Sequence, residues 1–103
     1  MSKILPLYSG STGNSTYIGT KNASILVDVG ASFKGIVENL SLIDTTPLEI
    51  LAVAVTHEHS DHIKGLSTFC KKTDIPVYAS KETADYIFER IPESESKLHI
   101  IEP

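Results

Sequence analysis

The fold is restricted most strongly by an uninterrupted apolar run, Ile50–Val55, that ends abruptly in a polar segment rich in histidine. Apolar runs of this length without alternation are typical of strands covered on both faces, as in a parallel sheet. The run is far shorter than the roughly 18–20 apolar residues that a membrane-spanning helix needs. We therefore expect a buried strand of an α/β sheet, and the loop at its end presents the segment His57–His62.

The segments before this strand alternate short apolar stretches with turns. Strands are predicted at Ile4–Tyr8, Thr16–Gly19 and Ser24–Val29, and we expect them to form an antiparallel meander. Ser32 is a predicted N-cap, because apolar residues follow it at helical spacing. The apolar stripe of this helix consists of Phe33, Ile36, Val37, Leu40 and Ile43.

Two more helices and two more strands are predicted after the histidine-rich segment. A short helix contains Ile63, Leu66, Phe69 and Cys70, a strand follows at Pro76–Ala79, and a last strand is expected at Leu98–Ile101. Ser80 is predicted to cap a helix that ends before Pro92. Its inward face is expected to hold Ala84, Ile87, Phe88 and Ile91. Glu93–Lys97 is predicted to be a polar loop.

Composition narrows the class of protein. A chain of 103 residues with 41% apolar residues is expected to form a single domain, residues 1–103, with a core. Nine basic residues against thirteen acidic ones leave a net charge of −4, so no basic surface indicates nucleic acid or an anionic membrane. Met1–Leu7 lacks the apolar core of a signal peptide, and a single cysteine, Cys70, suits a reducing compartment. We expect a cytoplasmic protein without membrane contact.

The polar segment after the apolar run contains the candidate metal ligands. Three of the four histidines of the chain and one aspartate lie within His57–His62. Imidazole and carboxylate are ligands that zinc, manganese and iron accept. In an extended loop His57 and His59 point the same way and could share one ion, while Asp61 and His62 face a second. Two such ions activate a bridging water as a nucleophile, so the spacing predicts a two-metal hydrolase, against the alternative of a solvated loop without a ligand.

The same segment excludes one familiar arrangement. A zincin helix needs His-Glu-x-x-His, but the residue four positions after His57 is Asp61. Glu58 is therefore not predicted to be a general base on a metal-binding helix.

The segment resembles the signature His-x-His-x-Asp-His of the metallo-beta-lactamase superfamily, an αββα sandwich of metal-dependent hydrolases. The resemblance implies that His57 and His59 bind one metal, that Asp61 and His62 bind another, and that Asp61 also orients the bridging hydroxide as a catalytic residue. The ions would be two Zn or Mn ions. Asp28, at the end of an earlier strand, would be a buried support of the site. Ser9–Ile18 resembles the start of a bacterial exonuclease-like subfamily encoded beside an essential cell-wall two-component system.

The family completes its site with a third histidine, a bridging aspartate and a last histidine, and no residues of this chain match them. His99 is predicted to be a packed or edge histidine of the last strand. The chain thus corresponds to the N-terminal half of the family domain, and one sheet face is expected to stay uncovered. At about 25 cal/mol per Å², several hundred Å² of wet apolar surface would cost on the order of 10 kcal/mol. We expect a missing C-terminal half, self-association or a swapped dimer.

The resemblance favours hydrolysis of phosphodiester bonds in DNA or RNA by the full-length protein, with the chain alone inactive. Two alternatives stay open. One is a small-molecule phosphodiesterase or thioester hydrolase, because the fold does not choose the substrate. The other is a non-catalytic metal-binding half-domain that needs a partner.

Overall fold

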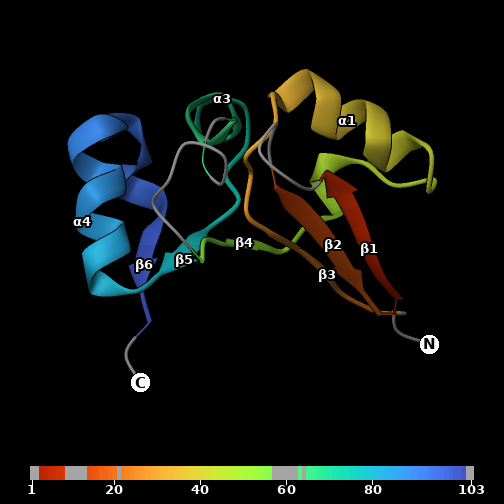
Figure 1. Cartoon of the computed structure of the whole chain (residues 1–103), viewed down its shortest axis with the longest axis horizontal. Helices are drawn as coiled ribbons and strands as arrows, with labels where there is room; N and C mark the ends of the chain where they lie inside the picture. The colour runs from red at the N-terminus through yellow and green to blue at the C-terminus, as the bar shows by residue number, and fades with distance from the viewer. Residues whose placement is uncertain (1–2, 9–13, 21, 57–62, 64, 102–103) are drawn as a thin grey trace.

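The computed structural model describes residues 3–8, 14–20, 22–56, 63 and 65–101 (Figure 1). In this part of the chain it contains a six-stranded sheet in the order β1-β2-β3-β4-β5-β6. The strands are β1 (Lys3–Tyr8), β2 (Ser15–Gly19), β3 (Ser24–Val27), β4 (Ala52–Ala54), β5 (Val77–Ala79) and β6 (Leu98–Ile100). The helices are α1 (Phe33–Ser41), α3 (Leu66–Lys72) and α4 (Lys81–Arg90), with the 3-10 helices η1 (Pro47–Glu49) and η2 (Pro92–Lys97). The predicted α/β class is confirmed.

The first three strands form the predicted antiparallel meander. Tyr17 of β2 lies opposite Leu5 of β1 and Leu26 of β3. The third strand is shorter than expected, since it ends at Val27 and not at Val29. Asp28, the next residue, has a φ of 67°, in the left-handed region, so the backbone leaves the extended conformation there.

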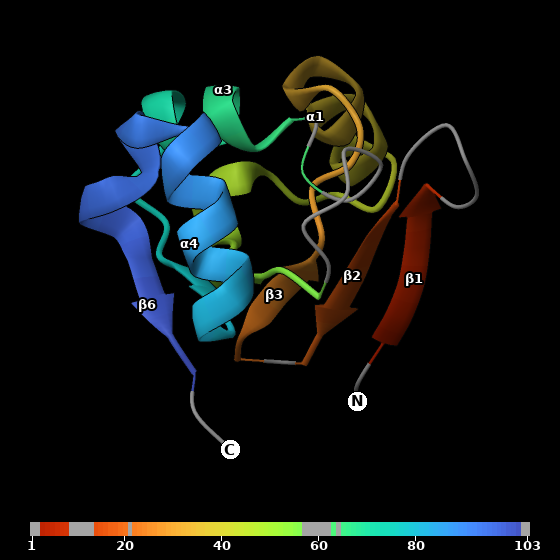
Figure 2. The same cartoon turned by 60° about the vertical axis from the view of Figure 1, so that its left-hand side comes forward.

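The four strands from β3 to β6 are parallel and follow one another across the sheet in one direction. Crossovers between parallel strands are right-handed in nearly all proteins, so connections that advance in one direction put their helices on one face. Figures 1 and 2 show α1, α3 and α4 on the same side of the sheet. The opposite face has no helix among the described residues.

This arrangement corrects one prediction about the apolar run. Its strand was expected to be covered on both faces, but burial alternates along it. Ile50, Val53 and Val55 are buried, Ala52 and Ala54 are half-buried, and Leu51 is 59% exposed. In the described part of the chain the helices cover only one face of this strand, which differs from the expected coverage on both faces and agrees with the expected uncovered face of the sheet.

The helices begin where the caps predict. The Ser32 hydroxyl accepts a hydrogen bond from the backbone N–H of Gly35 at 3.1 Å, and Ser80 accepts one from Thr83 at 3.3 Å. Ile36 and Leu40 of α1 are fully buried, and the Phe33 ring packs edge-on against Phe69 of α3 with centroids 5.5 Å apart. The two capped helices and α3 therefore share one core.

Two details of the C-terminal part differ from expectation. Phe88 was placed on the inward face of α4 but is 45% exposed, because Ala84 and Ile87 already fill the space against the sheet. The segment Glu93–Lys97 belongs to the 3-10 helix η2 and is not a loop. Ser94 explains the helix, since its fully buried hydroxyl donates to the carbonyl of Ile91 at 2.6 Å.

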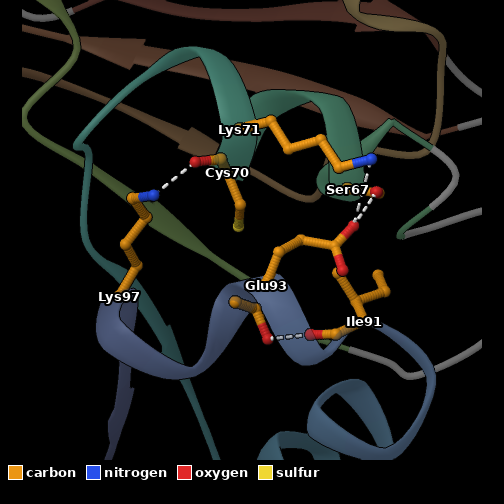
Figure 3. A network of polar contacts seen from close by, with 7 residues as sticks. Ser67, Cys70, Lys71, Ile91, Glu93 and Lys97 are labelled. Atoms are coloured by element: carbon orange, nitrogen blue, oxygen red, sulfur yellow. Dashed lines mark hydrogen bonds and ion pairs between the residues drawn. The ribbon is translucent and has the colours of Figure 1, made fainter.

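Polar contacts fasten η2 to α3 (Figure 3). Lys97 donates to the carbonyl of Cys70, and Glu93 accepts from Ser67 and lies 3.7 Å from Lys71. The hydrogen bond from Ser67 is the main reason why the pKa of the Glu93 carboxyl is lowered. Burial raises the pKa of the Cys70 thiol. Cys70 is thus a packed residue held as the neutral thiol.

No helix among the described residues is long and apolar enough to cross a bilayer.

Candidate metal centre

The candidate site starts where two neighbouring parallel strands end together. Val27, the last residue of β3, is paired with Ala54, the last residue of β4. The N–H of Asp28 continues this ladder by donating to the carbonyl of Ala54 at 2.7 Å. Because carboxyl ends of parallel strands meet at one edge of a sheet, Asp28 and Thr56 are brought side by side there.

Asp28 is fastened to Thr56 by two hydrogen bonds. One carboxylate oxygen accepts from the Thr56 backbone N–H and the other from the Thr56 hydroxyl, both at 2.7 Å. Asp28 is only 5% exposed, so bonds to its carboxylate are stronger than they would be in water. Thr56 immediately precedes His57, the first residue of the motif. The backbone is therefore fixed at the last position before the motif.

The left-handed backbone of Asp28 is part of this arrangement. An L residue in that region costs about 1–2 kcal/mol, although aspartate and asparagine enter it more readily than others. Asp28 holds this conformation at the point where its carboxylate bonds to the end of β4. Asp28 is buried and hydrogen-bonded, while its support of a metal stays a prediction.

The predicted ligands His57, His59, Asp61 and His62 lie outside the described residues, so their roles stay predictions. In the part of the chain that the structure describes, no three His, Cys, Asp or Glu residues gather into a group that could hold an ion. His99 lies on β6, a sheet edge, and is exposed, with its ring stacked on Tyr78 at 5.0 Å between centroids. It is the edge histidine that the sequence predicts.

The donors nonetheless suit a divalent metal by their chemistry. Three imidazoles and the carboxylate of Asp61 follow within six residues of Thr56, whose position Asp28 fixes. Such mixed nitrogen and oxygen donors are those that zinc, manganese and iron accept. Residues carried on a fixed strand end hold ligands with less loss of entropy than residues of a free loop.

Sequence reasoning missed two contributors to this edge. Thr56 was assigned no role, although it supplies both donors to Asp28. Its place between a strand end and the first histidine was the available signal. The second is Asn14, whose carbonyl accepts the N–H of Gly30 at 2.8 Å and so brings the start of β2 to the same turn. No sequence pattern pointed to that backbone contact.

Comparison with known proteins defines the class. Residues 8–102 match the sequence profile of the metallo-beta-lactamase superfamily, so the chain belongs to that superfamily. It is 46% identical over 77 residues to exodeoxyribonuclease YycJ of Bacillus anthracis and 43% identical over 77 residues to exodeoxyribonuclease WalJ of Streptococcus pneumoniae. Each alignment covers 75% of this chain and 29% of the relative. The chain thus spans under a third of the curated relatives it matches.

A solved structure agrees with the fold. A metallo-beta-lactamase from Cronobacter sakazakii with an HARLDQ motif, in a mutant form, superimposes with a TM-score of 0.72 at 23% identity. The superposition covers 84% of this chain and 34% of that chain. At this identity the likeness shows the fold alone. Metal binding is a property that this fold implies, while the number and kind of ions belong to the proposal below.

Proposed function

We propose that this chain is the N-terminal half of a metal-dependent phosphodiester hydrolase that removes nucleotides from the ends of DNA. The observation that carries the proposal is the bond pair from Asp28 to Thr56, which fixes the residue directly before the motif. The exodeoxyribonuclease names of the relatives at 43–46% identity support the substrate class. The cytoplasm, where DNA and a reduced Cys70 occur together, is the proposed location.

The proposed roles follow the motif. His57 and His59 would hold one divalent ion, and Asp61 and His62 a second, both zinc or manganese. When bound, such ions supply Lewis acidity toward a phosphoryl oxygen and lower the pKa of a water ligand. Asp61 would orient the attacking oxygen toward phosphorus by accepting its hydrogen bond. Asp28 and Thr56 would keep the ligand loop at the end of the sheet.

The uncovered sheet face supports a second part of the proposal. Ile25, Val27 and Ala54 lie on this face, and none of them is buried in the described structure. We propose that a C-terminal half or a second copy covers the face and completes the site. Until then the chain would be a metal-binding half-domain without activity.

Metal content tests the site. We expect chain purified without chelator or affinity tag to hold about one or more zinc, manganese or iron ions, measured by elemental analysis. His59→Ala should lose the metal, because a motif ligand is gone. His99→Ala is the matched control, since it removes an exposed histidine outside the motif, and it should retain the metal. Equal metal content in wild type and His59→Ala would contradict the proposal.

The substrate is tested separately. The chain, and any longer polypeptide that carries it, is assayed with end-labelled linear DNA, with RNA, and with a small phosphodiester and a thioester. The longer polypeptide should release mononucleotides from DNA ends and lose this activity in Asp61→Asn, while the 103-residue chain alone should be inactive. Turnover of RNA alone would replace DNA by RNA as the substrate and overturn the deoxyribonuclease proposal. Turnover of a small ester alone would favour a small-molecule hydrolase and overturn the nuclease proposal.

A further inference from the structure

Gly65 occupies a crowded position directly before α3. Its N–H donates to the carbonyl of Val29 at 2.8 Å, and its own carbonyl accepts from Phe69 at 3.0 Å in the first turn of the helix. In Figure 1 the turn after β3 (orange) runs beside α3. The start of α3 is thus joined to the residue that follows Asp28.

The packing there leaves no space for a side chain. A Cβ on Gly65 would overlap the carbonyl oxygen of Ala31 and lie 3.2 Å from both the Ala31 carbonyl carbon and Cγ1 of Val29. The φ of Gly65 is −91°, a value open to any residue, so space and not backbone conformation requires glycine. The overlapping atom is backbone and cannot rotate away. Any larger residue must push the start of α3 and the turn apart.

The turn that binds Thr56 before the motif also binds Gly65 after it. Thr56, before the motif, bonds to the Asp28 carboxylate, and Gly65, after it, bonds to Val29. All four residues of the turn, Asp28–Ala31, are buried, so it is a rigid support. The two residues that flank the segment 57–64, Thr56 and Gly65, are therefore bonded to the consecutive residues Asp28 and Val29.

We infer that Gly65 is a positioning residue for the metal ligands, because only a residue without a side chain lets the segment after the motif pack on the Asp28–Ala31 turn. The inference rests on the proposed metal site. Gly65 would not touch the metal. It would set the separation between the two ends of the ligand loop, and hence the geometry in which His57–His62 meet an ion. Residues that hydrogen-bond directly to metal ligands typically alter metal affinity 10–100-fold when changed, and that range is the scale against which we set the effect of displacing the ligand loop.

The test compares two glycine substitutions in the 103-residue chain. Gly65→Ala creates the backbone overlap. Gly19→Ala is the matched control, because the three atoms nearest to a Cβ there all belong to the side chain of Tyr17. Gly19 also pairs with Ser24, at the end of β3 remote from Asp28. Each variant is titrated with Co²⁺, whose visible d–d absorption reports the geometry of the ligands. Circular dichroism melting checks the fold.

We expect Gly65→Ala to bind Co²⁺ at least about tenfold more weakly than wild type and with an altered absorption band. Gly19→Ala should keep the wild-type affinity and band even where it lowers the melting temperature. Unchanged affinity and absorption in a folded Gly65→Ala protein would overturn the inference. A purely structural role would lower the melting temperature of both variants without changing the band.

A measurement on wild-type protein covers the case in which Gly65→Ala does not fold. The amide of Gly65 is hydrogen-bonded to Val29, so it should exchange with solvent only in global opening. Exchange at the rate of an unprotected amide would overturn the inference. If the wild type binds no Co²⁺, the proposed metal site fails, and the positioning role is judged by NMR alone. Amide shifts of residues 57–64 should then change in Gly65→Ala and not in Gly19→Ala, and unchanged shifts would overturn it.

Discussion

The two faces of the sheet differ sharply in burial although both are apolar. On the helix-covered face Leu26, Val53 and Val77 are fully buried beneath α1, α3 and α4. On the opposite face no described strand residue is buried, and Ile4 is 69% exposed. That face carries Ile4, Pro6, Thr16, Ile18, Ile25, Val27, Ala52, Ala54, Tyr78 and His99.

The contrast shows that the sequence encodes more burial than the described structure provides. Sheets with one solvated face usually alternate apolar and polar residues along each strand. Here Ile25 and Val27 point away from the helices, where polar side chains would be expected. Contiguous apolar surface of this kind marks an interaction site. The open face is therefore the surface that the proposed second layer would cover.

Adjacent residues of β3 give the largest contrast between the faces. Leu26→Ala should lower the free energy of unfolding by about 2–5 kcal/mol, because it leaves a cavity in the covered core. Ile25→Ala should lower it by about 1 kcal/mol or less, because that side chain is only half-buried. Urea unfolding followed by circular dichroism measures both. Equal losses would mean that the open face is covered in solution.

Self-association tests whether the open face is in fact an interface. We expect the isolated chain to sediment as dimers or larger species at micromolar concentration. Ile25→Glu should raise the dissociation constant at least about tenfold, or about 1.4 kcal/mol, because a charge would enter an apolar contact. Glu38→Lys, an exposed change on α1, is the control and should not alter sedimentation. A monomer that binds no hydrophobic dye would contradict the interface.

Substitution of Asp28, at the carboxyl end of β3, should lower the free energy of unfolding by an amount between those expected for Leu26→Ala and Ile25→Ala. Asp28→Ala removes the acceptor of both Thr56 bonds and should lower the free energy of unfolding by about 1–3 kcal/mol. Asp28→Asn should cost less, because asparagine also enters the left-handed region and keeps one acceptor oxygen. Chemical denaturation of both variants measures the difference. If Asp28→Asn is as unstable as Asp28→Ala, the loss of stability is caused by the loss of the negative charge alone.

Much of this fold was readable from the sequence because local signals agreed with the packing. Ser32 and Ser80 cap helices as predicted, and the meander and the parallel strands lie where apolar stretches fall between turns. The errors arise where tertiary contacts decide. Glu93–Lys97 was predicted to be a polar loop, yet contacts with Ser67 and Cys70 stabilise it as part of η2. The coverage of the apolar run depends on which way successive crossovers advance, which no local pattern encodes.

The candidate site was likewise predictable from the sequence only in part. Its donor chemistry is visible in His57–His62, because residue type and spacing alone define it. The anchoring at Thr56 and Gly65 was not predicted. Both depend on a turn that is distant in sequence, and hydrogen bonds to a main-chain carbonyl or to a strand end leave no periodic pattern.

The smallest expected effect concerns the covered side, where Glu93 joins η2 to α3. The folded-state pKa of Glu93 is lowered, first by the hydrogen bond from Ser67 and further by a backbone hydrogen bond and by Lys71. A carboxyl whose folded pKa lies below its unfolded value of about 4.3 binds protons more weakly in the folded state. Its contribution to stability is present above that pH and is lost as the pH falls through the folded pKa.

Glu93→Gln should therefore be less stable than wild type near neutral pH, and the difference should shrink as the pH falls below about 4.3. Urea midpoints of the two proteins at several pH values between neutral and acid measure it. Glu38→Gln, which removes the charge of an exposed glutamate of α1, is the control for the substitution itself. A Glu93→Gln difference that stays constant with pH would show that the α3–η2 contact depends on shape and not on charge. The α3–η2 contact would then be held by apolar packing and not by the charge of Glu93.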